Sequence, residues 1–403
     1  MGRDEVAGQN GYVPRFEPFR AIRYAPGLDL PALIAPPYDV LSDADVDELA
    51  ARDEHNIVHV DVPRGGDDRY QVAGRLLRHW LDDGTLVRDT EPTYTLYRMR
   101  FTDATGTPRD LVGVLGGLEV VDEGAGGVLP HERTTPKAST DRLDLTRATG
   151  TNLSPVWGLS LAAGLTALLE APGEPVGSIT VGGVEHVVER VSDPERIAAI
   201  RAQLASDDVL IADGHHRYGV SRIHRDDVRA ATGRTDSAAE ETLAFVGELV
   251  AEQLSIEAIH RLYTGTSFED LRDALAARFD LSPADRPTPA TLATMEADGH
   301  LVLLGREGAW WLTPKPGAFA AVRALDGAWL EATLEGTAVE VTYQHGLDEV
   351  LAAVEHGVAT AAVLIRPVSL DEIERTAREG LLMPPKSTFF TPKLRTGFVL
   401  REL

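Results

Sequence analysis

The segment with the clearest chemical potential is a polar turn that follows a short apolar run. Residues 209–212 read Val-Leu-Ile-Ala, and residues 213–217 read Asp-Gly-His-His-Arg. The apolar run is typical of a buried strand, and the apolar spacing after residue 217 favours a helix. A glycine at such a turn lets the backbone approach a ligand, and the helix start offers free N–H groups to an anion. The pattern therefore predicts a phosphate-binding turn.

The side chains of this turn suit the same chemistry. His215, His216 and Arg217 would add charge-assisted donors for a phosphate. Asp213 would hold a divalent metal or act as a base. The alternative is a capped helix start with surface histidines, and a pentapeptide alone does not decide between the two.

A second polar segment lies between residues 129 and 155. It gathers a histidine, a carboxylate, basic residues and small polar residues, namely His131, Glu132, Lys137, Arg142, Asn152 and Ser154. In a protein this acidic, so much positive charge in one segment predicts an anion site. A solvated surface loop is the alternative.

A third segment, residues 383–393, carries Lys386, Ser387, Thr388 and Lys393. Prolines on either side of the Lys-Ser-Thr group stiffen the backbone and would hold its donors at low entropic cost. Only four of the 39 basic residues are lysines, and three of those four lie in the second and third segments. We therefore expect the three segments to share one phosphate-handling site, although a terminal β-hairpin with exposed lysines also fits the third.

Composition excludes several classes of protein. The 403 residues include 39 basic and 63 acidic side chains, a formal charge of −24, and no cysteine. The acidic balance argues against nucleic-acid binding, and the absence of cysteine excludes disulfides and cysteine nucleophiles. No Walker-type loop, GxGxxG, GxSxG or HExxH motif is present. The polar start is no signal peptide, and no apolar stretch reaches the ~20 residues of a membrane span, so we expect a cytoplasmic protein without membrane contact.

The elements that must position these segments alternate along the chain. Residues 43–52 and 70–83 have the spacing of amphipathic helices, and residues 178–191 alternate like a β-hairpin around two glycines. Residues 238–252 are predicted to be helical. Helix and strand patterns mix in every third of the chain, which predicts a mixed α/β (α+β) fold.

Taken in order, these motifs resemble a known family. The sequence is similar to a widespread prokaryotic family of uncharacterised proteins, the domain-of-unknown-function family 1015, over nearly the whole chain. The residues that carry the resemblance are Pro18–Ala21, Pro36–Val40, His131–Arg142, Asn152–Pro155, Ala212–Tyr218, His260–Arg261, Met383–Lys393 and Gly397.

The turn at residues 214–217 also resembles the phosphate-binding turn of the ParB/sulfiredoxin superfamily, which includes free-serine kinases with a similar DGHHR sequence. The resemblance implies a ParB/sulfiredoxin-like core at residues 126–265, with additional α+β parts at 1–125 and 266–403, the latter returning the PPKST segment to the site. This sequence lacks the cysteine of sulfiredoxin and any basic segment for DNA binding. In the C-terminal motif, Thr391 stands where the family has an aromatic residue.

The resemblance implies an enzyme that transfers phosphoryl groups on a small phosphorylated metabolite, with serine or phosphoserine as the expected substrate, with Mg²⁺ and with ADP or ATP. His131, Glu132, Asp213 and His216 would be catalytic, and Asp213 would hold the metal. The residues expected to bind phosphate or substrate are Gly214, His215, Arg217, Lys137, Arg142, Asn152, Ser154, Lys386, Ser387, Thr388 and Lys393.

Two alternatives stay open at this point. The protein could be a nucleotide-binding regulatory module without turnover, or a metal-dependent hydrolase with His215 and His216 as ligands. The second ranks last because adjacent histidines on a helix rarely converge on one ion. The direction of transfer, the phosphate donor and a homodimeric state are also left open.

Overall fold

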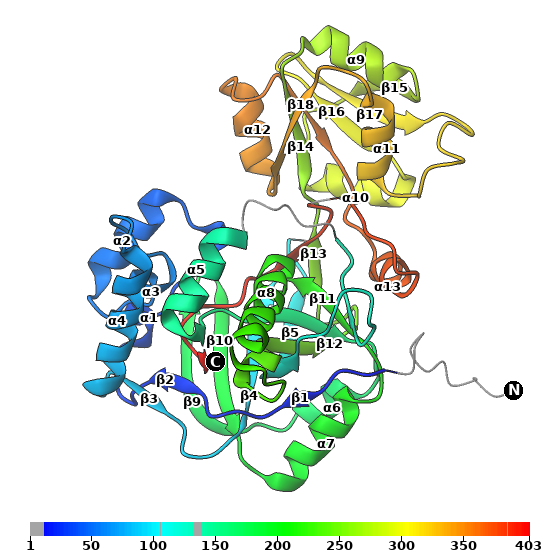
Figure 1. Cartoon of the computed structure of the whole chain (residues 1–403). Coiled ribbons are helices and arrows are strands. Elements are labelled where there is room, and N and C mark those ends of the chain that lie inside the picture. The colour runs from blue at the N-terminus through cyan, green and yellow to red at the C-terminus, as the bar shows by residue number, and fades with distance from the viewer. Residues whose placement is uncertain (1–11, 105, 133–138, 385) are drawn as a thin grey trace, which may run out of the picture. The chain divides into compact units, whose positions relative to one another are not determined.

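The chain folds into two units, each described here by itself. Figure 1 shows the computed structural model, which describes residues 12–104, 106–132, 139–384 and 386–403. The first unit contains the described residues up to Leu254, together with Ala377–Leu381 and Pro392–Leu403. The second unit contains Ser255–Thr376 and Leu382–Thr391. The C-terminal segment therefore belongs to the first unit.

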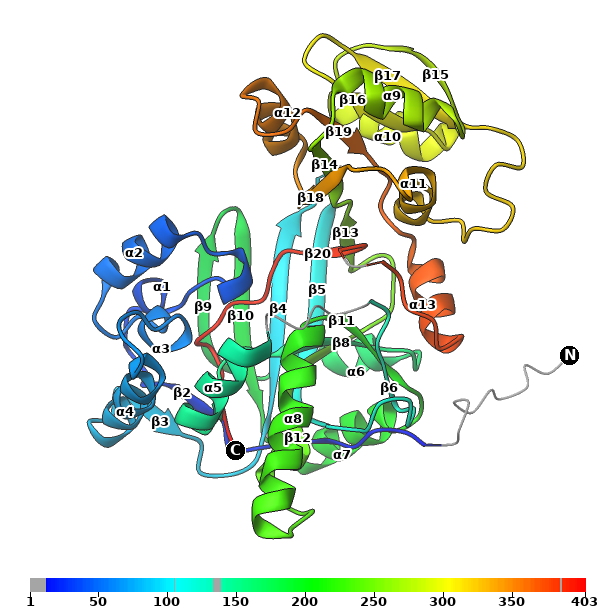
Figure 2. The same ribbon diagram turned by 45° about the horizontal axis from the view of Figure 1, so that its top comes forward.

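A nine-stranded sheet forms the centre of the first unit. Its strands lie in the order β6 (Val128–Leu129), β11 (Val209–Asp213), β8 (Val156–Ser160), β12 (Glu241–Glu248), β5 (Pro108–Glu119), β4 (Tyr94–Thr102), β10 (Val184–Val191) and β9 (Glu174–Val181), with β1 (Phe16–Glu17) also paired to β5. The pairs β6–β11 and β8–β12 are parallel, and the others are antiparallel. The long strands β4 and β5 run side by side in Figure 2.

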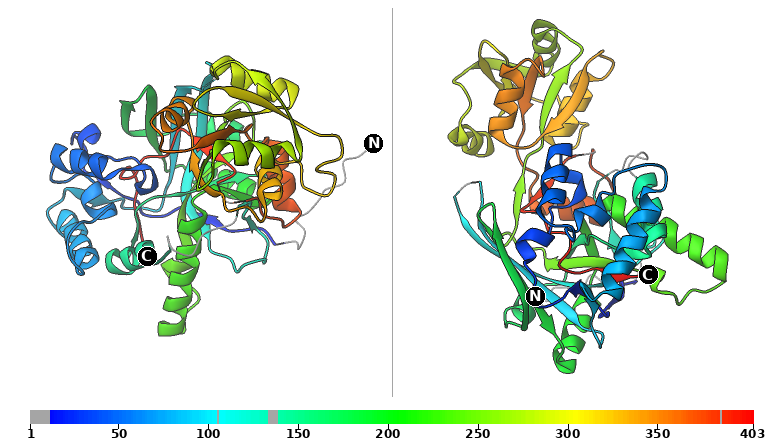
Figure 3. Two further views of the ribbon diagram at one scale, coloured as in Figure 1. Left: turned by 90° about the horizontal axis from the view of Figure 1, so that it is seen from above. Right: turned by 90° about the vertical axis from the view of Figure 1, so that its left-hand side faces the viewer.

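Glycines in β5 make room for aromatic rings against this sheet. A Cβ at Gly113 would come within 2.3 Å of the Phe245 ring, and one at Gly116 would come within 2.4 Å of the Phe16 ring. Glycine is otherwise unfavourable inside a strand, so these positions mark close packing. The sheet core is completed by helices α6 (Leu165–Leu169), α7 (Pro194–Leu204) and α8 (His215–Thr232), which are seen with the sheet in Figure 3.

A second core in the first unit is built around the buried Trp80. It takes residues from the helices α1 (Leu30–Leu33), α2 (Asp43–Arg52), α3 (Val58–Asp61), α4 (Arg69–Asp82) and α5 (Ser139–Thr149) and from the paired strands β2 (Ile22–Tyr24) and β3 (Leu86–Arg88). The same unit also contains the short turns η1 (Tyr38–Val40) and η3 (Ala238–Glu240) and the paired strands β7 (Thr151–Asn152) and β21 (Arg401–Glu402). Ser42 closes a capping box at the start of α2. The helices predicted at 43–52 and 70–83 are confirmed.

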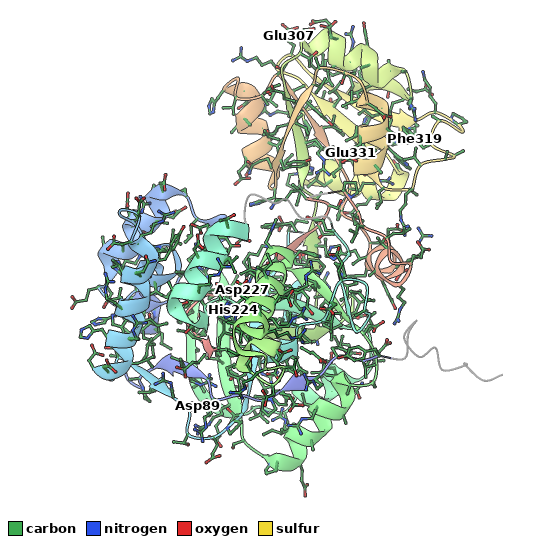
Figure 4. All side chains as sticks on the ribbon, in the orientation of Figure 1. Asp89, His224, Asp227, Glu307, Phe319 and Glu331 are labelled. Atoms are coloured by element: carbon green, nitrogen blue, oxygen red, sulfur yellow. The ribbon has the colours of Figure 1, made fainter. Side chains whose placement is uncertain are left out.

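The second unit is built on an antiparallel six-stranded sheet. Its order is β15 (Phe279–Ala284), β17 (Ala309–Pro314), β16 (Leu301–Leu304), β19 (Ala361–Leu364), β14 (His260–Thr264) and β18 (Glu340–Gln344), with helices α9 (Phe268–Ala276), α10 (Pro289–Asp298), α11 (Asp326–Leu334) and α12 (Leu347–Glu355). Strand β13 (Ser255–Glu257) pairs with β20 (Phe389–Thr391), and α13 (Leu370–Arg378) crosses the division between the units. Phe319, labelled in Figure 4, stacks on Trp329 with ring centroids 5.0 Å apart.

The predicted mixed α/β fold class is confirmed, with helices and sheets in both units. The hairpin predicted at 178–191 is β9 and β10. The helix predicted at 238–252 is wrong: this segment forms η3 and the buried strand β12, because its run from Leu243 to Val246 is apolar on both sides of the sheet. Among the described residues, no helix is both long enough and apolar enough to cross a bilayer.

The three parts predicted from the sequence differ from the two observed units. The boundary predicted between residues 125 and 126 falls within the first unit, whose sheet takes β4 and β5 from one side of it and β8, β11 and β12 from the other. The second boundary, predicted between 265 and 266, lies eleven residues beyond the observed division at 254 and 255 (265 − 254 = 11).

A buried histidine links the stability of the first unit to pH. His186 on β10 is fully buried, and its Nδ1 lies 2.9 Å from the hydroxyl of Tyr97. The same hydroxyl accepts from the Arg395 N–H over 3.1 Å. Burial lowers the pKa of His186 to about 3. As the pH drops below about 6.5, this histidine becomes protonated in the unfolded chain but stays neutral in the folded protein. The free energy of unfolding therefore falls as the pH drops below that value.

We expect the lowered pKa of His186 alone to reduce the free energy of unfolding by about 1.4 kcal/mol for each pH unit by which the pH falls between about pH 6 and pH 4. Urea unfolding at a series of pH values measures it. In His186→Gln the slope should decrease by one proton. Equal slopes in His186→Gln and wild type would contradict the assignment.

Candidate functional site

The turn between β11 and α8 places the Asp-Gly-His-His-Arg segment at the start of an 18-residue helix. Strand β11 ends at Asp213, and Gly214 has a φ of +87°, in the left-handed region that favours glycine. A Cβ added at Gly214 would lie 3.0 Å from the guanidinium carbon of Arg217. Glycine at this position therefore allows both the sharp turn and the return of Arg217 over it.

Asp213 lies between two cationic side chains. Lys393 Nζ donates to its Oδ1 over 3.0 Å, and Arg217 Nη2 donates to its Oδ2 over 2.7 Å. Burial alone would raise the pKa of the Asp213 carboxyl, but Lys393 and Arg217 together hold it well below its usual range. Arg217 Nη1 also donates to the Pro155 carbonyl oxygen. The carboxylate thus stays ionised and fixes the direction of Arg217.

Two histidines pack against each other beside this turn. His131 is fully buried, and its ring lies 4.8 Å from that of His215, centroid to centroid. His131 Nδ1 donates to the Ile211 carbonyl oxygen over 2.6 Å, and the His131 N–H donates to His215 Nε2 over 3.4 Å. Burial lowers the pKa of His131 to about 4, and burial followed by the neighbouring His131 lowers the pKa of His215 well below its ordinary value. Both rings are therefore neutral at pH 7.

A polar cavity of about 40 Å³ lies next to α8 in the first unit. This volume has room for roughly three water molecules, and therefore for a group of a few heavy atoms such as a phosphoryl group. The residues that line it come from η1, α3, α5, the chain from β7 to Ser154, α8 and β12. They are Tyr38, Asp61, Arg142, Leu145, Thr146, Thr151, Asn152, Leu153, Ser154, Arg217, Val220, Ser221 and Thr242. We call it the α8 cavity.

Two arginines face the α8 cavity, and each is held by carboxylates. Arg217 is fixed by Asp213 as described above. Arg142 Nη1 donates to the main-chain oxygen and to Oδ1 of Asp61, over 2.7 and 3.2 Å, and its Nε and Nη2 donate to Asp141. The Arg142 guanidinium also lies 4.1 Å from the centre of the Tyr38 ring, a cation–π contact. Both guanidiniums are therefore positioned before any ligand binds.

The structure brings together part of the predicted site. Arg142, Asn152, Ser154 and Arg217 all line the α8 cavity. Asn152 Oδ1 accepts from the Leu243 N–H over 3.0 Å, and Ser154 Oγ lies 3.1 Å from the hydroxyl of Thr396.

Other predicted residues lie elsewhere. Glu132 is half-buried directly after His131, and His216 is half-buried in the first turn of α8. Lys137 lies outside the described residues. Lys386, Ser387 and Thr388 belong to the second unit, so their contribution to the site stays a prediction.

Tyr38 and Asp61 are two of the cavity residues that were not predicted from the sequence. Tyr38 belongs to the Pro-Pro-Tyr-Asp-Val motif that carries the family resemblance, and that motif is the signal that could have found it. Asp61 ends the four-residue helix α3 in an apolar stretch, and no local motif marks it. It reaches the cavity only through the packing of α3 with the other helices of the second core.

The predicted metal site does not fit the contacts of Asp213. Both of its carboxylate oxygens are engaged by cations, Lys393 and Arg217, which take the place that a metal ion would need. Within the described parts of the chain, no group of three or more histidine and carboxylate side chains could hold a metal ion. The protein therefore offers no preformed Mg²⁺ site at this turn.

Comparison with known families decides the relationship suggested by the motifs. The model of a family described as a protein of unknown function (DUF1015) matches residues 16–328, more than half of the sequence. The chain belongs to the DUF1015 family. Among curated proteins, no match to this DUF1015 sequence is found.

Several solved structures are similar to this DUF1015 protein at low identity. A conserved hypothetical protein from Pyrococcus furiosus is 12% identical with a TM-score of 0.38, covering 68% of this chain and 91% of its own. A free serine kinase in complex with AMP is 12% identical with a TM-score of 0.37, covering 67% and 88%. SbnI with a C-terminal truncation, from Staphylococcus aureus, is 13% identical with a TM-score of 0.39, covering 71% and 87%. TM-scores this low carry no argument about the activity of the DUF1015 chain.

The conformation of the turn at Gly214 predicts how two glycine substitutions change the stability of this DUF1015 protein. Gly214→Ala should lower the free energy of unfolding by about 1–3 kcal/mol, because the new Cβ meets Arg217 and the left-handed φ is strained. Gly219→Ala is the matched control on the same helix, since no atom lies within 4 Å of its added Cβ, and it should raise the free energy by up to about 1 kcal/mol. Urea unfolding measures both. Equal effects of the two substitutions would show that the turn is not strained.

Proposed function

We propose that this protein is a phosphoryl-transfer enzyme that acts on a small phosphorylated metabolite, with serine and phosphoserine as the preferred pair. The observation that carries the proposal is the α8 cavity, into which Arg142 and Arg217 are directed from two different helices. Transfer of a phosphoryl group depends mainly on positioning and on cations around its oxygens. Two fixed guanidiniums at a cavity of phosphoryl size meet both demands.

The charges around the cavity favour an anion. The lining contains two arginines and a single carboxylate, Asp61. Burial raises the pKa of Asp61 above its ordinary value, although Arg142 and Arg217 act in the opposite direction. Guanidinium groups bind phosphate oxygens through paired N–H donors. The asparagine and serine that line the same cavity, Asn152 and Ser154, add polar groups from the β7 segment.

The N-terminus of α8 supplies the second element of the proposal. We infer that it acts as a phosphate-binding turn of the ParB/sulfiredoxin kind and receives the phosphates of ADP or ATP, because its first N–H groups follow a left-handed glycine. Since Asp213 is already paired with two cations, any Mg²⁺ would come with the nucleotide phosphates. We propose that the reaction, with a nucleotide as substrate, takes place in the cytoplasm.

The decisive experiment incubates the purified protein and Mg²⁺ with phosphoserine and ADP, and separately with serine and ATP, and follows the products by phosphorus NMR. We expect phosphoryl transfer between nucleotide and serine in at least one mixture. If the protein binds nucleotide tightly but forms no product across a panel of small hydroxy acids and their phosphates, it is the regulatory module and the proposal fails.

The role proposed for the cavity arginines predicts different activities for two arginine substitutions on α5. Arg142→Gln should lower kcat/KM by roughly 10- to 100-fold, because a charge-assisted contact to phosphate contributes about 1.5–3 kcal/mol. Arg147→Gln, on the same helix but half-exposed and paired with Asp227, should keep wild-type activity. Figure 4 labels Asp227 on α8. Thermal unfolding of both variants checks the fold, and an active, folded Arg142→Gln protein would refute the role of the cavity.

A further inference from the structure

Asp61 is a buried carboxylate with an unused oxygen. Its residue is 2% exposed, and Oδ1 accepts from Arg142 Nη1 over 3.2 Å. Oδ2 is also shielded from solvent, and within the described residues it has no hydrogen-bond partner. A buried carboxylate oxygen without a donor is costly, and a donor group supplied by a bound ligand is one way to offset that cost.

The place of Asp61 identifies the kind of partner. Asp61 lines the α8 cavity together with Arg142 and Arg217. The ion pair with Arg142 uses only Oδ1 of Asp61. A residue that served only to hold Arg142 would not need its second oxygen buried beside the cavity. A carboxylate cannot accept from an anionic phosphate oxygen, because neither carries a hydrogen. The group that fits Oδ2 is an O–H or N–H donor bound next to the phosphoryl group.

We infer that Asp61 is the proton acceptor of this enzyme and that the acceptor substrate is an alcohol whose hydroxyl donates to Asp61 Oδ2. This inference rests on the proposed phosphoryl transfer. As the hydroxyl oxygen bonds to the terminal phosphorus of a nucleoside di- or triphosphate, its proton passes to Oδ2. The bond from that phosphorus to the bridging oxygen breaks, and its electron pair leaves on the nucleotide. The products are a phosphate ester and a nucleotide shortened by one phosphate.

The environment of Asp61 suits a base. The charged and titratable groups that act on it are Arg142, Arg217, Asp39, Asp141 and, through its ring hydroxyl, Tyr38. Burial raises its pKa, with the two arginines acting against the rise and the two aspartates adding to it. A general base works best when its pKa approaches the operating pH. In the reverse direction the protonated Asp61 would return its proton to the leaving alcohol.

The test compares Asp61→Asn with Asp47→Asn, a substitution on α2 at a residue whose side chain is 72% exposed. Asparagine keeps an oxygen for Arg142 but accepts no proton. We expect kcat of Asp61→Asn to fall roughly 10²- to 10⁴-fold, the range of general-base catalysis. Its binding of phosphoserine, measured by calorimetry, should be unchanged or tighter, because a negative charge has left the cavity. Asp47→Asn should match wild type in both measurements.

A pH profile separates catalysis from a purely structural role. The kcat of wild type should rise with pH as Asp61 ionises, and Asp61→Asn should lack this rise. If wild type transfers phosphoryl groups and Asp61→Asn keeps its kcat and pH profile, Asp61 is not the base although the proposed function stands. If wild type transfers nothing under any condition, the proposed function itself fails. A loss of phosphoserine binding in a folded Asp61→Asn protein would assign Asp61 to the support of Arg142 and overturn the inference.

Discussion

The structure of the site depends on the pairing of buried carboxylates with arginine and lysine side chains. A charge removed from water must find a partner of opposite charge, or the folded protein loses stability. Asp213 meets this need with Arg217 and Lys393, and Arg142 meets it with Asp61 and Asp141. Because these partners come from distant parts of the sequence, the pairs connect β11 and α8 with the C-terminal segment, and α3 with α5.

These pairs also prepare the arginines for an anion. An arginine on a flexible loop would lose conformational entropy on binding, whereas Arg142 and Arg217 are already fixed by their carboxylates. The same pairing lowers their net charge, so the cavity attracts an anion less strongly than two bare guanidiniums would. Asp61 differs from Asp213 in this pairing, because burial raises the pKa of Asp61, whereas Lys393 and Arg217 together lower the pKa of Asp213.

The sequence predicted the parts of this arrangement that depend on local pattern. The strand and helix around Gly214 follow from apolar spacing and from one glycine, and the α/β class follows from the alternation of patterns. Residues 238–252 were assigned to the wrong element, because a short apolar run fits a buried strand and a buried helix equally.

Contacts between distant residues were harder to foresee. Lys393 was predicted to bind phosphate or substrate, and its contact with the carboxylate of Asp213 was not foreseen. Asp61 escaped notice because its burial is decided by helix packing, to which no local motif points.

The contrast between surface and cavity now explains the composition. A net charge of −24 spread over the chain repels large polyanions at long range. A small phosphorylated metabolite that reaches the cavity is instead governed by the few groups around it, since buried charges are screened far less than exposed ones. Arginine fits the lining of the α8 cavity better than lysine would. Its planar guanidinium carries five N–H donors, so that some can bind a carboxylate while others bind the ligand. Under the proposed function, a protein so acidic outside binds phosphate inside because its buried carboxylates, such as Asp213 and Asp61, are paired with arginines.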